Sequence, residues 1–178
     1  MSYWAKMRGS SQSPPGVGLA EVLWSWLGAF LGIAAVALLN QYWLAGTDLL
    51  LIIGSFGASA VLIYGAVKSP LAQPRNLMGG HLISAVIGVA CYQWLGQVPW
   101  LAAAVAVATA IAAMHASKTL HPPGGASALI AVIGSPQIHA LGFFYVLVPV
   151  GLGAAVMLAV ALLVNNLAPQ RRYPEFWL

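Results

Sequence analysis

The sequence predicts an all-α membrane protein with about six transmembrane segments, arranged as two inverted repeats of three segments with broken helices near the bilayer midplane. Hydrophobic residues make up 61% of the 178 residues and charged residues only 6%. A soluble domain carries about 25% charged residues, so the main solvent of this chain is expected to be lipid. Two further observations, the apolar segments and a repeated small-residue motif, complete the prediction.

Six apolar segments follow one another along the chain, at residues 22–39, 49–67, 80–95, 100–116, 124–133 and 141–164. A helical crossing needs roughly 20 residues, so the fifth segment is too short to cross as helix alone. We therefore expect a transmembrane domain over residues 21–166, with polar tails at residues 1–20 and 167–178.

The basic residues decide between two topologies. If all six segments cross, all seven Lys and Arg residues fall on one side of the membrane. If the fifth segment only re-enters, Arg171 and Arg172 fall on the other side. The positive-inside rule favours six crossings with both termini in the cytoplasm.

A short motif recurs in the middle segment of each set of three. Gly57-Ala58-Ser59-Ala60 resembles Gly125-Ala126-Ser127-Ala128. Because three crossings is an odd number, the second set would enter the membrane from the opposite side. This is the layout of inverted-repeat transporters.

The residues before each motif indicate a broken helix. Two adjacent prolines, Pro122 and Pro123, predict that residues 118–123 enter the membrane extended and that a helix begins near Gly124. The first N–H groups of such a helix lack partners and favour a small anion. The expected anion site comprises both helix starts and the residues beside them: Gly54, Ser55, Gly57, Ala58, Ser59, His121, Pro122, Pro123, Gly124, Gly125, Ala126 and Ser127.

Three histidines accompany these segments. His121 either contacts the anion and carries a coupled proton, or orients the broken loop. His81 and His115 lie near helix ends, and the interpretation favoured for both is a core histidine that a neighbour satisfies.

Five other polar residues receive structural interpretations. Lys118 and Arg75 are expected at the membrane interface as orientation signals, from which they could also attract anions. Asn76 either faces the anion or turns its loop. Asp48 is expected to mark an outer loop or to cap the second segment, and Glu21 suits the dipole at its helix start.

Other functional classes find little support. The chain shows no phosphate-binding loop or zinc pattern, and its three acids lie in different segments, so we expect no catalytic residues, no metal and no cofactor. The basic residues do not cluster as a nucleic-acid surface requires. A homo-oligomer, dimer or trimer, is expected because 178 residues give thin walls and the Gly/Ala-rich faces favour helix contacts.

Three stretches of this sequence resemble the HPP family of integral membrane proteins, named for His-Pro-Pro. They are His121–Ala126, Gly54–Ser59, and Gln73-Pro74-Arg75-Asn76 with the following Gly80-His81. The resemblance spans residues 54–134 and implies nitrite as the substrate, since plant chloroplast and cyanobacterial members are linked to nitrite transport. It also implies a bacterial inner membrane, with a cyanobacterial one as an option. Members have been described with four membrane helices, whereas we expect six.

We therefore expect a transporter for a small monovalent anion, with nitrite as the first candidate. Two alternatives stay open at this point. One is a passive channel for chloride or formate-like ions, and the other is a non-transporting structural subunit of a membrane complex.

Overall fold

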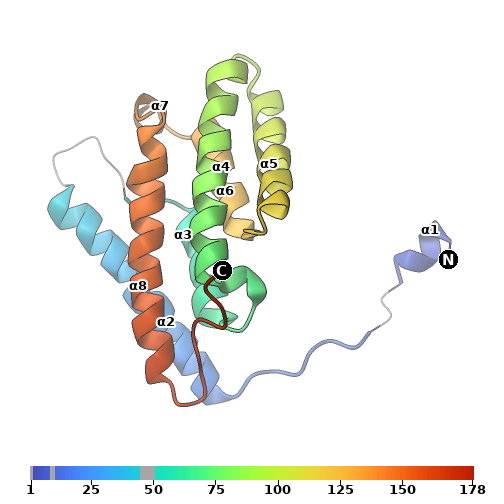
Figure 1. The fold of residues 1–178 in the computed structure, drawn as a ribbon, viewed down its shortest axis with the longest axis vertical. Helices are drawn as coiled ribbons and strands as arrows, with labels where there is room; N and C mark the ends of the chain where they lie inside the picture. The colour runs from blue at the N-terminus through green and yellow to red at the C-terminus, as the bar shows by residue number, and fades with distance from the viewer. Residues whose placement is uncertain (1, 9–10, 45–50) are drawn as a thin grey trace.

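The computed structural model describes residues 2–8, 11–44 and 51–178, and these residues form helices joined by loops (Figure 1). Asp48, the expected outer-loop acid, lies outside the described residues. In chain order the elements are α1 (Tyr3–Lys6), α2 (Leu19–Trp43), α3 (Ser55–Ala60), the π-helical turn η1 (Val61–Gly65), the 3₁₀ turn η2 (Pro70–Ala72), α4 (Pro74–Leu95), α5 (Pro99–Ala116), α6 (Pro122–Ile133), α7 (Pro136–Ala140), the π-helical turn η3 (Val146–Gly151) and α8 (Leu152–Leu167).

Four of these helices are long and apolar enough to cross a membrane. They are α2, α4, α5 and the stretch Val146–Leu167, which comprises η3 and α8. Two shorter apolar helices, Ser55–Gly65 and Pro122–Ile133, occupy the second and fifth predicted segments. The expected helical, multi-pass membrane class is therefore confirmed.

Two helices begin earlier than the sequence predicted. The prediction placed the third segment at residue 80, but α4 begins at Pro74, so the stretch Pro74–Asn76 forms its first turn. Helix α6 begins at Pro122 rather than near Gly124. Proline is tolerated in the first turn of a helix, where its missing N–H has no intrahelical role, so these prolines start the helices.

The last predicted segment is interrupted. After the short helix α7, the chain enters η3, in which Val148 has non-helical angles (φ −135°, ψ 118°). The next residue, Pro149, cannot donate a backbone hydrogen bond. The last predicted segment is therefore broken before α8, at a position that the sequence did not predict.

The helices pack as two units. Helices α4, α5 and α6 pack on one another and form the α4–α5–α6 unit. Helix α2 packs on α8 and η1, and with α3 these elements form the α2–α3–α8 unit. Helix α3 also contacts α6, so the two shorter broken helices meet where the units join (Figure 1).

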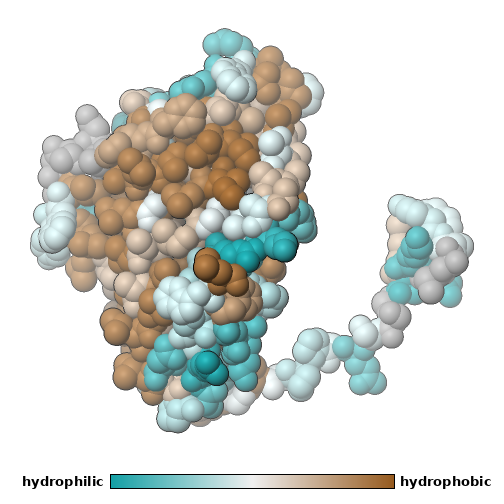
Figure 2. All heavy atoms as spheres, viewed as in Figure 1, coloured by the Kyte–Doolittle hydropathy of each residue, from teal (hydrophilic) through white to brown (hydrophobic). Residues whose placement is uncertain are grey.

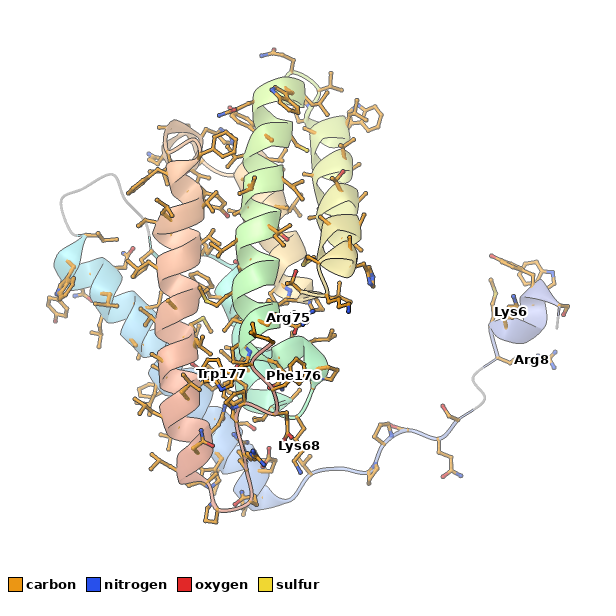
Figure 3. All side chains as sticks on the ribbon, in the orientation of Figure 1. Lys6, Arg8, Lys68, Arg75, Phe176 and Trp177 are labelled. Carbon is orange, nitrogen blue, oxygen red and sulfur yellow. The ribbon has the colours of Figure 1, made fainter. Side chains whose placement is uncertain are left out.

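The face of the bundle drawn in Figure 2 is apolar over much of its area, and polar residues gather toward its two ends. Large apolar side chains such as Trp26 and Leu163 are 64% and 69% exposed, as expected of residues that face lipid. Lys68 lies toward the lower end of the bundle, and Arg75 lies above it, near the middle of the bundle's height (Figure 3).

A buried arginine joins the ends of α2 and α8. The guanidinium of Arg171 pairs with Glu21, with Nη2 2.7 Å from Oε1, and Nε donates to Oε2 at 3.0 Å. Arg171 also donates to Ser25 Oγ and Asn165 Oδ1. Asn165 Nδ2 in turn donates to the carbonyl of Ile63 in η1, so one polar network ties α2, α8 and the π-helical turn together.

The C-terminal residues pack against the loop that precedes α4. Tyr173 Oη donates to the carbonyl of Ala72 at 2.8 Å, and the backbone N–H of Glu175 donates to Gln73 Oε1. Tyr173 is only 2% exposed, and burial raises the pKa of its phenol. Part of the expected tail at residues 167–178 is therefore ordered on the bundle.

Candidate functional site

Five polar side chains are buried together where α3, α4 and α6 meet. Ser55, Ser59, His81, His121 and Ser127 are each at most 1% exposed, although the surrounding core is apolar. Buried polar groups in a membrane domain must find internal partners, and such groups commonly mark functional sites. We call these five residues the Ser–His cluster.

His81 is the centre of the cluster. Its Nε2 lies 2.7 Å from Ser59 Oγ on α3, and its Nδ1 lies 2.8 Å from Ser127 Oγ on α6. Ser59 and Ser127 are the equivalent serines of the two Gly-Ala-Ser-Ala motifs. A single imidazole on α4 therefore bridges the two copies of the motif.

His121 extends the cluster toward the loop before α4. Its Nδ1 lies 2.8 Å from the carbonyl oxygen of Leu71, which can only accept, so Nδ1 carries a proton. Its Nε2 lies 2.9 Å from Ser59 Oγ. The ring centroids of His81 and His121 are 5.0 Å apart, with the planes at 61°. Ser59 thus contacts both imidazoles.

The other end of the cluster is closed by hydroxyl groups. Ser127 Oγ donates to Ser55 Oγ at 3.0 Å. The hydroxyl of Tyr145 donates to the carbonyl of Ser127 at 3.0 Å, and Tyr145 is fully buried. The cluster is thereby anchored to the segment between α7 and η3.

Glycines allow the helices around the cluster to approach closely. A Cβ on Gly124 would lie 2.7 Å from the carbonyl oxygen of Gly80, and a Cβ on Gly88 would lie 2.5 Å from that of Ala128. Contacts this short are not seen for real Cβ atoms. Helices α4 and α6 can therefore approach this closely only because Gly88 and Gly124 have no side chain. This approach places Ser127 within hydrogen-bonding distance of His81.

The predicted site residues divide into two groups. The structure brings Ser55, Ser59, His121 and Ser127 together, with Gly124 buried beside them. The others lie elsewhere or nearer the surface: Gly54, Gly57, Ala58 and Pro122 are exposed, Gly125 and Ala126 are half-buried, and Pro123 is buried in the first turn of α6.

Several of the backbone donors expected at the two helix starts already have partners or are absent. The first two residues of α6 are prolines, which have no N–H, and the N–H of Gly124 donates to the carbonyl of His121 at 2.8 Å. In α3 the N–H groups of Phe56 and Gly57 donate to the carbonyls three residues earlier, at Ile53 and Gly54. Side chains, rather than free backbone N–H groups, are therefore the main polar feature of the site.

The two helix starts lie side by side rather than end to end. Ser55, the first residue of α3, contacts Ser127 in the second turn of α6. Ser59, one turn into α3, contacts His121 at the N-cap of α6. His81 lies seven residues after Pro74, so the site is roughly 10 Å along α4 from its start.

Sequence reasoning undervalued His81. The interpretation as a core histidine is right about its burial and its neighbours, but it missed that both neighbours are motif serines. The preceding Gly79-Gly80 was the available signal, because small residues in a helix permit close approach of another helix. His115, the other histidine treated in the same way, is exposed and lies outside the cluster.

The remaining polar residues of this end have structural contacts. Arg75 donates to the carbonyl of Lys118 at 2.8 Å, and Asn76 Nδ2 donates to that of Leu120 at 2.9 Å. Among the described residues, two buried side-chain oxygens have no partner, Asn76 Oδ1 and Ser84 Oγ. Ser84 Oγ lies 2.9 Å from where a Cβ on Gly124 would be, so it faces the contact between α4 and α6.

Comparison with known proteins places the chain in a family. The profile described as HPP, transmembrane region, matches residues 14–174. Two transmembrane proteins of Dictyostelium discoideum are 48% and 45% identical to this chain, in alignments of 181 and 183 positions. Each alignment covers 99% of the chain.

The chain spans 58% and 64% of the lengths of these two relatives. No solved structure matches it. The profile covers nearly all of the chain, including every residue of the Ser–His cluster, and the long apolar helices agree with its description. This chain is therefore an integral membrane protein of the HPP family.

Proposed function

We propose that this chain transports a small monovalent anion across a membrane, with the Ser–His cluster on the transport path. The observation that carries the proposal is the burial of five polar side chains at the junction of two broken helices. Apolar side chains packed at this junction could stabilise a membrane domain equally well. The presence of buried polar groups there therefore favours a role in transport. Nitrite is the first substrate to test, because the family resemblance points to it.

The packing supports six crossings built as two inverted repeats. The contact of α2 with α8 has a counterpart in the contact of α5 with α4. The contact of α3 and η1 with α2 has a counterpart in the contact of α6 with α5. These pairs match if α2, α3 and α4 correspond to α5, α6 and α8. In this arrangement His81 lies between the corresponding serines, Ser59 and Ser127.

The charge distribution supports termini in the cytoplasm. Lys68, Arg171 and Arg172 line one groove of about 440 Å³, and Arg75 contacts the loop that carries Lys118. Cations gathered at one end of a bundle indicate its cytoplasmic side. The bacterial inner membrane expected from the sequence stays a prediction.

Transport would require the two units to separate. The cluster is closed on all sides in this structure, so an anion can reach it only if α3 moves away from α6. The π-helical turn η1 and the break at Val148 are irregular points at which α3 and α8 could bend. We propose that the α2–α3–α8 unit rocks against the α4–α5–α6 unit.

Nitrite flux into proteoliposomes tests the proposal. We expect uptake by the intact protein, and its loss in Ser59→Ala and in Ser127→Ala, because each removes a hydroxyl that contacts His81. Ser117→Ala is the matched control, since Ser117 is exposed and its hydroxyl contacts only its own loop and helix end.

Gly125→Leu serves as a second control. Its Cβ would meet only Val107, at 3.9 Å, on the side of a groove of about 520 Å³. We therefore expect it to keep flux. Folded intact protein that moves none of nitrite, nitrate, formate and chloride would refute transport.

One observation favours a second candidate, a structural subunit of a larger membrane complex. Every nitrogen and oxygen of the cluster side chains has a partner within the chain, as in a packing device. That candidate predicts no flux, and it predicts that Ser59→Ala lowers thermal stability without a transport phenotype. A passive anion channel would give flux that never accumulates anion against its gradient.

We also propose a homo-oligomer, dimer or trimer. Gly57 and Ala58 are exposed, and Ala58 and Ala126 line a groove of about 390 Å³ between α3 and α6. Small residues at a lipid-facing surface favour close helix contacts between copies. Mass measurement of the protein in nanodiscs would give the copy number.

A further inference from the structure

The Ser–His cluster forms one unbroken chain of hydrogen bonds. It runs from the carbonyl of Leu71 through His121, Ser59, His81 and Ser127 to Ser55. Its five contacts measure 2.8, 2.9, 2.7, 2.8 and 3.0 Å in that order. The four links from His121 to Ser55 join nitrogens and hydroxyls that can exchange protons, and the carbonyl of Leu71 accepts the bond at the end.

Counting protons along the chain shows two states. The carbonyl of Leu71 only accepts, and Ser127 donates to Ser55. Each of the five contacts needs one proton, so the four groups between these ends, which are the two imidazoles and the hydroxyls of Ser59 and Ser127, must supply five protons. Two neutral imidazoles and the hydroxyls of Ser59 and Ser127 supply four. In this arrangement one imidazole must therefore carry a second proton.

The second state is reached when one imidazole releases a proton and the hydroxyl hydrogens rotate. If Ser55 donates to Ser127, its hydroxyl supplies the fifth proton and both imidazoles are neutral. Ser59 then donates to His121 and accepts from His81. The two states have the same heavy-atom contacts and differ by one proton.

The extra proton has no counter-charge from the described residues. Helix α3 presents Phe56 to the His81 ring, with centroids 5.6 Å apart, and α6 presents Ser127. Tyr145 donates its hydroxyl hydrogen to a backbone carbonyl. The basic groups Arg75 and Lys118 lie at the loop end, and Arg75 is engaged with backbone carbonyls.

The carboxylates of the described residues lie elsewhere. Glu21 pairs with Arg171, and Glu175 belongs to the exposed C-terminal residues. A cation without a counter-charge is costly inside a membrane domain. A bound monovalent anion would remove that cost, so proton and anion should bind the cluster together.

We propose that the Ser–His cluster takes up one proton with each anion, so that the pair crosses the membrane without net charge. This inference rests on the transport function proposed above and adds its coupling ion. The proton joins an imidazole nitrogen on one side of the membrane and leaves from it on the other. The anion remains intact throughout.

The test measures proton and anion movement together in proteoliposomes. An anion gradient is imposed without a pH gradient, with nitrite and separately with nitrate, and internal pH is followed by a trapped dye. We expect the lumen to acidify as anion enters, with close to one proton per anion. Protein-free liposomes set the baseline, because undissociated nitrous acid crosses bilayers unaided.

A potassium diffusion potential provides the second arm. A conductive anion path would shift the anion distribution about 50-fold per 100 mV, whereas a neutral pair would not respond. Anion flux that follows the potential, or that moves no protons, overturns the coupling and leaves transport intact. Absence of any flux from folded protein overturns the proposed function instead.

Variants place the proton at the cluster. His81→Gln and His121→Gln should each abolish proton movement, because glutamine cannot take up a proton. His115→Gln is the control, since His115 is exposed and is not part of the hydrogen-bonded Ser–His cluster. This variant should keep close to one proton per anion. Proton coupling that survives in folded His81→Gln and His121→Gln would overturn the assignment, and the intact protein tests the stoichiometry even if these variants do not fold.

Discussion

The α4–α5–α6 unit and the α2–α3–α8 unit are held together by different kinds of contact. In the first, glycines let backbones touch, as Gly88 does at the carbonyl of Ala128 and Gly124 at that of Gly80. In the second, glycines receive aromatic side chains: Tyr64 fills the space beside Gly28 and Gly32. Arg171 and its partners complete the second unit.

This difference teaches how each unit should respond to change. Backbone contacts have no side chain that can adjust, so a single added methyl must separate two helices. Aromatic and polar contacts involve individual side chains that can be removed one at a time. We expect abrupt effects in the first unit and graded effects in the second.

The largest effect is expected at the glycine contacts. Gly124→Ala places a methyl 2.7 Å from a backbone carbonyl and should cost about 3 kcal/mol in the free energy of unfolding. Its neighbour is the control, because Gly125→Ala meets only Val107 at 3.9 Å and should cost little. Thermal unfolding in detergent compares the two. Equal melting temperatures would show that α4 and α6 are less tightly fitted than described.

The buried ion pair should give an intermediate effect. The Arg171 side chain is 2% exposed but that of Glu21 is 28% exposed, so solvent screens part of their attraction. Arg171→Met should cost about 2 kcal/mol, because Glu21 and Asn165 lose their partner. The double variant with Glu21→Gln should recover part of the loss. If the double variant lost as much free energy of unfolding as the two single variants together, the pair would contribute no coupling energy.

A smaller effect is expected from a single hydrogen bond in the second unit. The hydroxyl of Tyr64 donates to the carbonyl of Met157 at 3.0 Å, and Tyr64→Phe removes that bond while keeping the ring between Gly28 and Gly32. The cost should be about 1 kcal/mol. Tyr42→Phe, at a side chain that is 72% exposed, should leave the melting temperature unchanged. A loss above that of Arg171→Met would contradict the graded order.

The smallest effect belongs to the C-terminal residues and depends on pH. Burial raises the pKa of Tyr173, so the folded state favours the neutral phenol. This contribution to stability is fully present below the ordinary tyrosine pKa of about 10, and it is lost as the pH rises above about 10. Tyr173→Phe should lower stability slightly at pH 7, since it loses the bond to Ala72. The deficit should shrink at alkaline pH, and a constant deficit from pH 7 to 11 would contradict this origin.

Much of the fold followed from the sequence. The low charge content and the apolar segments predicted a helical membrane protein, and the double proline predicted the broken start of α6. The position of that start was two residues late, because proline was taken only as a helix breaker and not as a first-turn residue. The break at Val148 was missed, because a single proline inside an apolar run can be accommodated in a membrane helix.

The candidate site was predicted only in part. Small residues and serines at equal positions indicated where two broken helices would meet, and these serines do meet at His81. The sequence could not show that His81 bridges them, because that depends on how closely Gly80 and Gly124 bring α4 to α6. Because α6 begins at Pro122 rather than near Gly124, the N–H of Gly124 that was expected to face an anion donates to the carbonyl of His121 instead.

The π-helical turn η1 sets the rotational phase of α3. A π-helical turn accommodates one more residue than the α-helical turn it replaces, and one residue corresponds to about 100° of rotation around a helix. Tyr64 is fixed beside Gly28 and Gly32 at one end of this turn, and Ser59 faces His81 beyond its other end. Without the extra residue, Ser55 and Ser59 would be turned about a quarter of the way round α3, away from the imidazole. Deleting one residue from Val61–Gly65 would therefore leave the composition of the helix almost intact while redirecting both serines, which makes the alignment of the cluster a property of chain length in this turn.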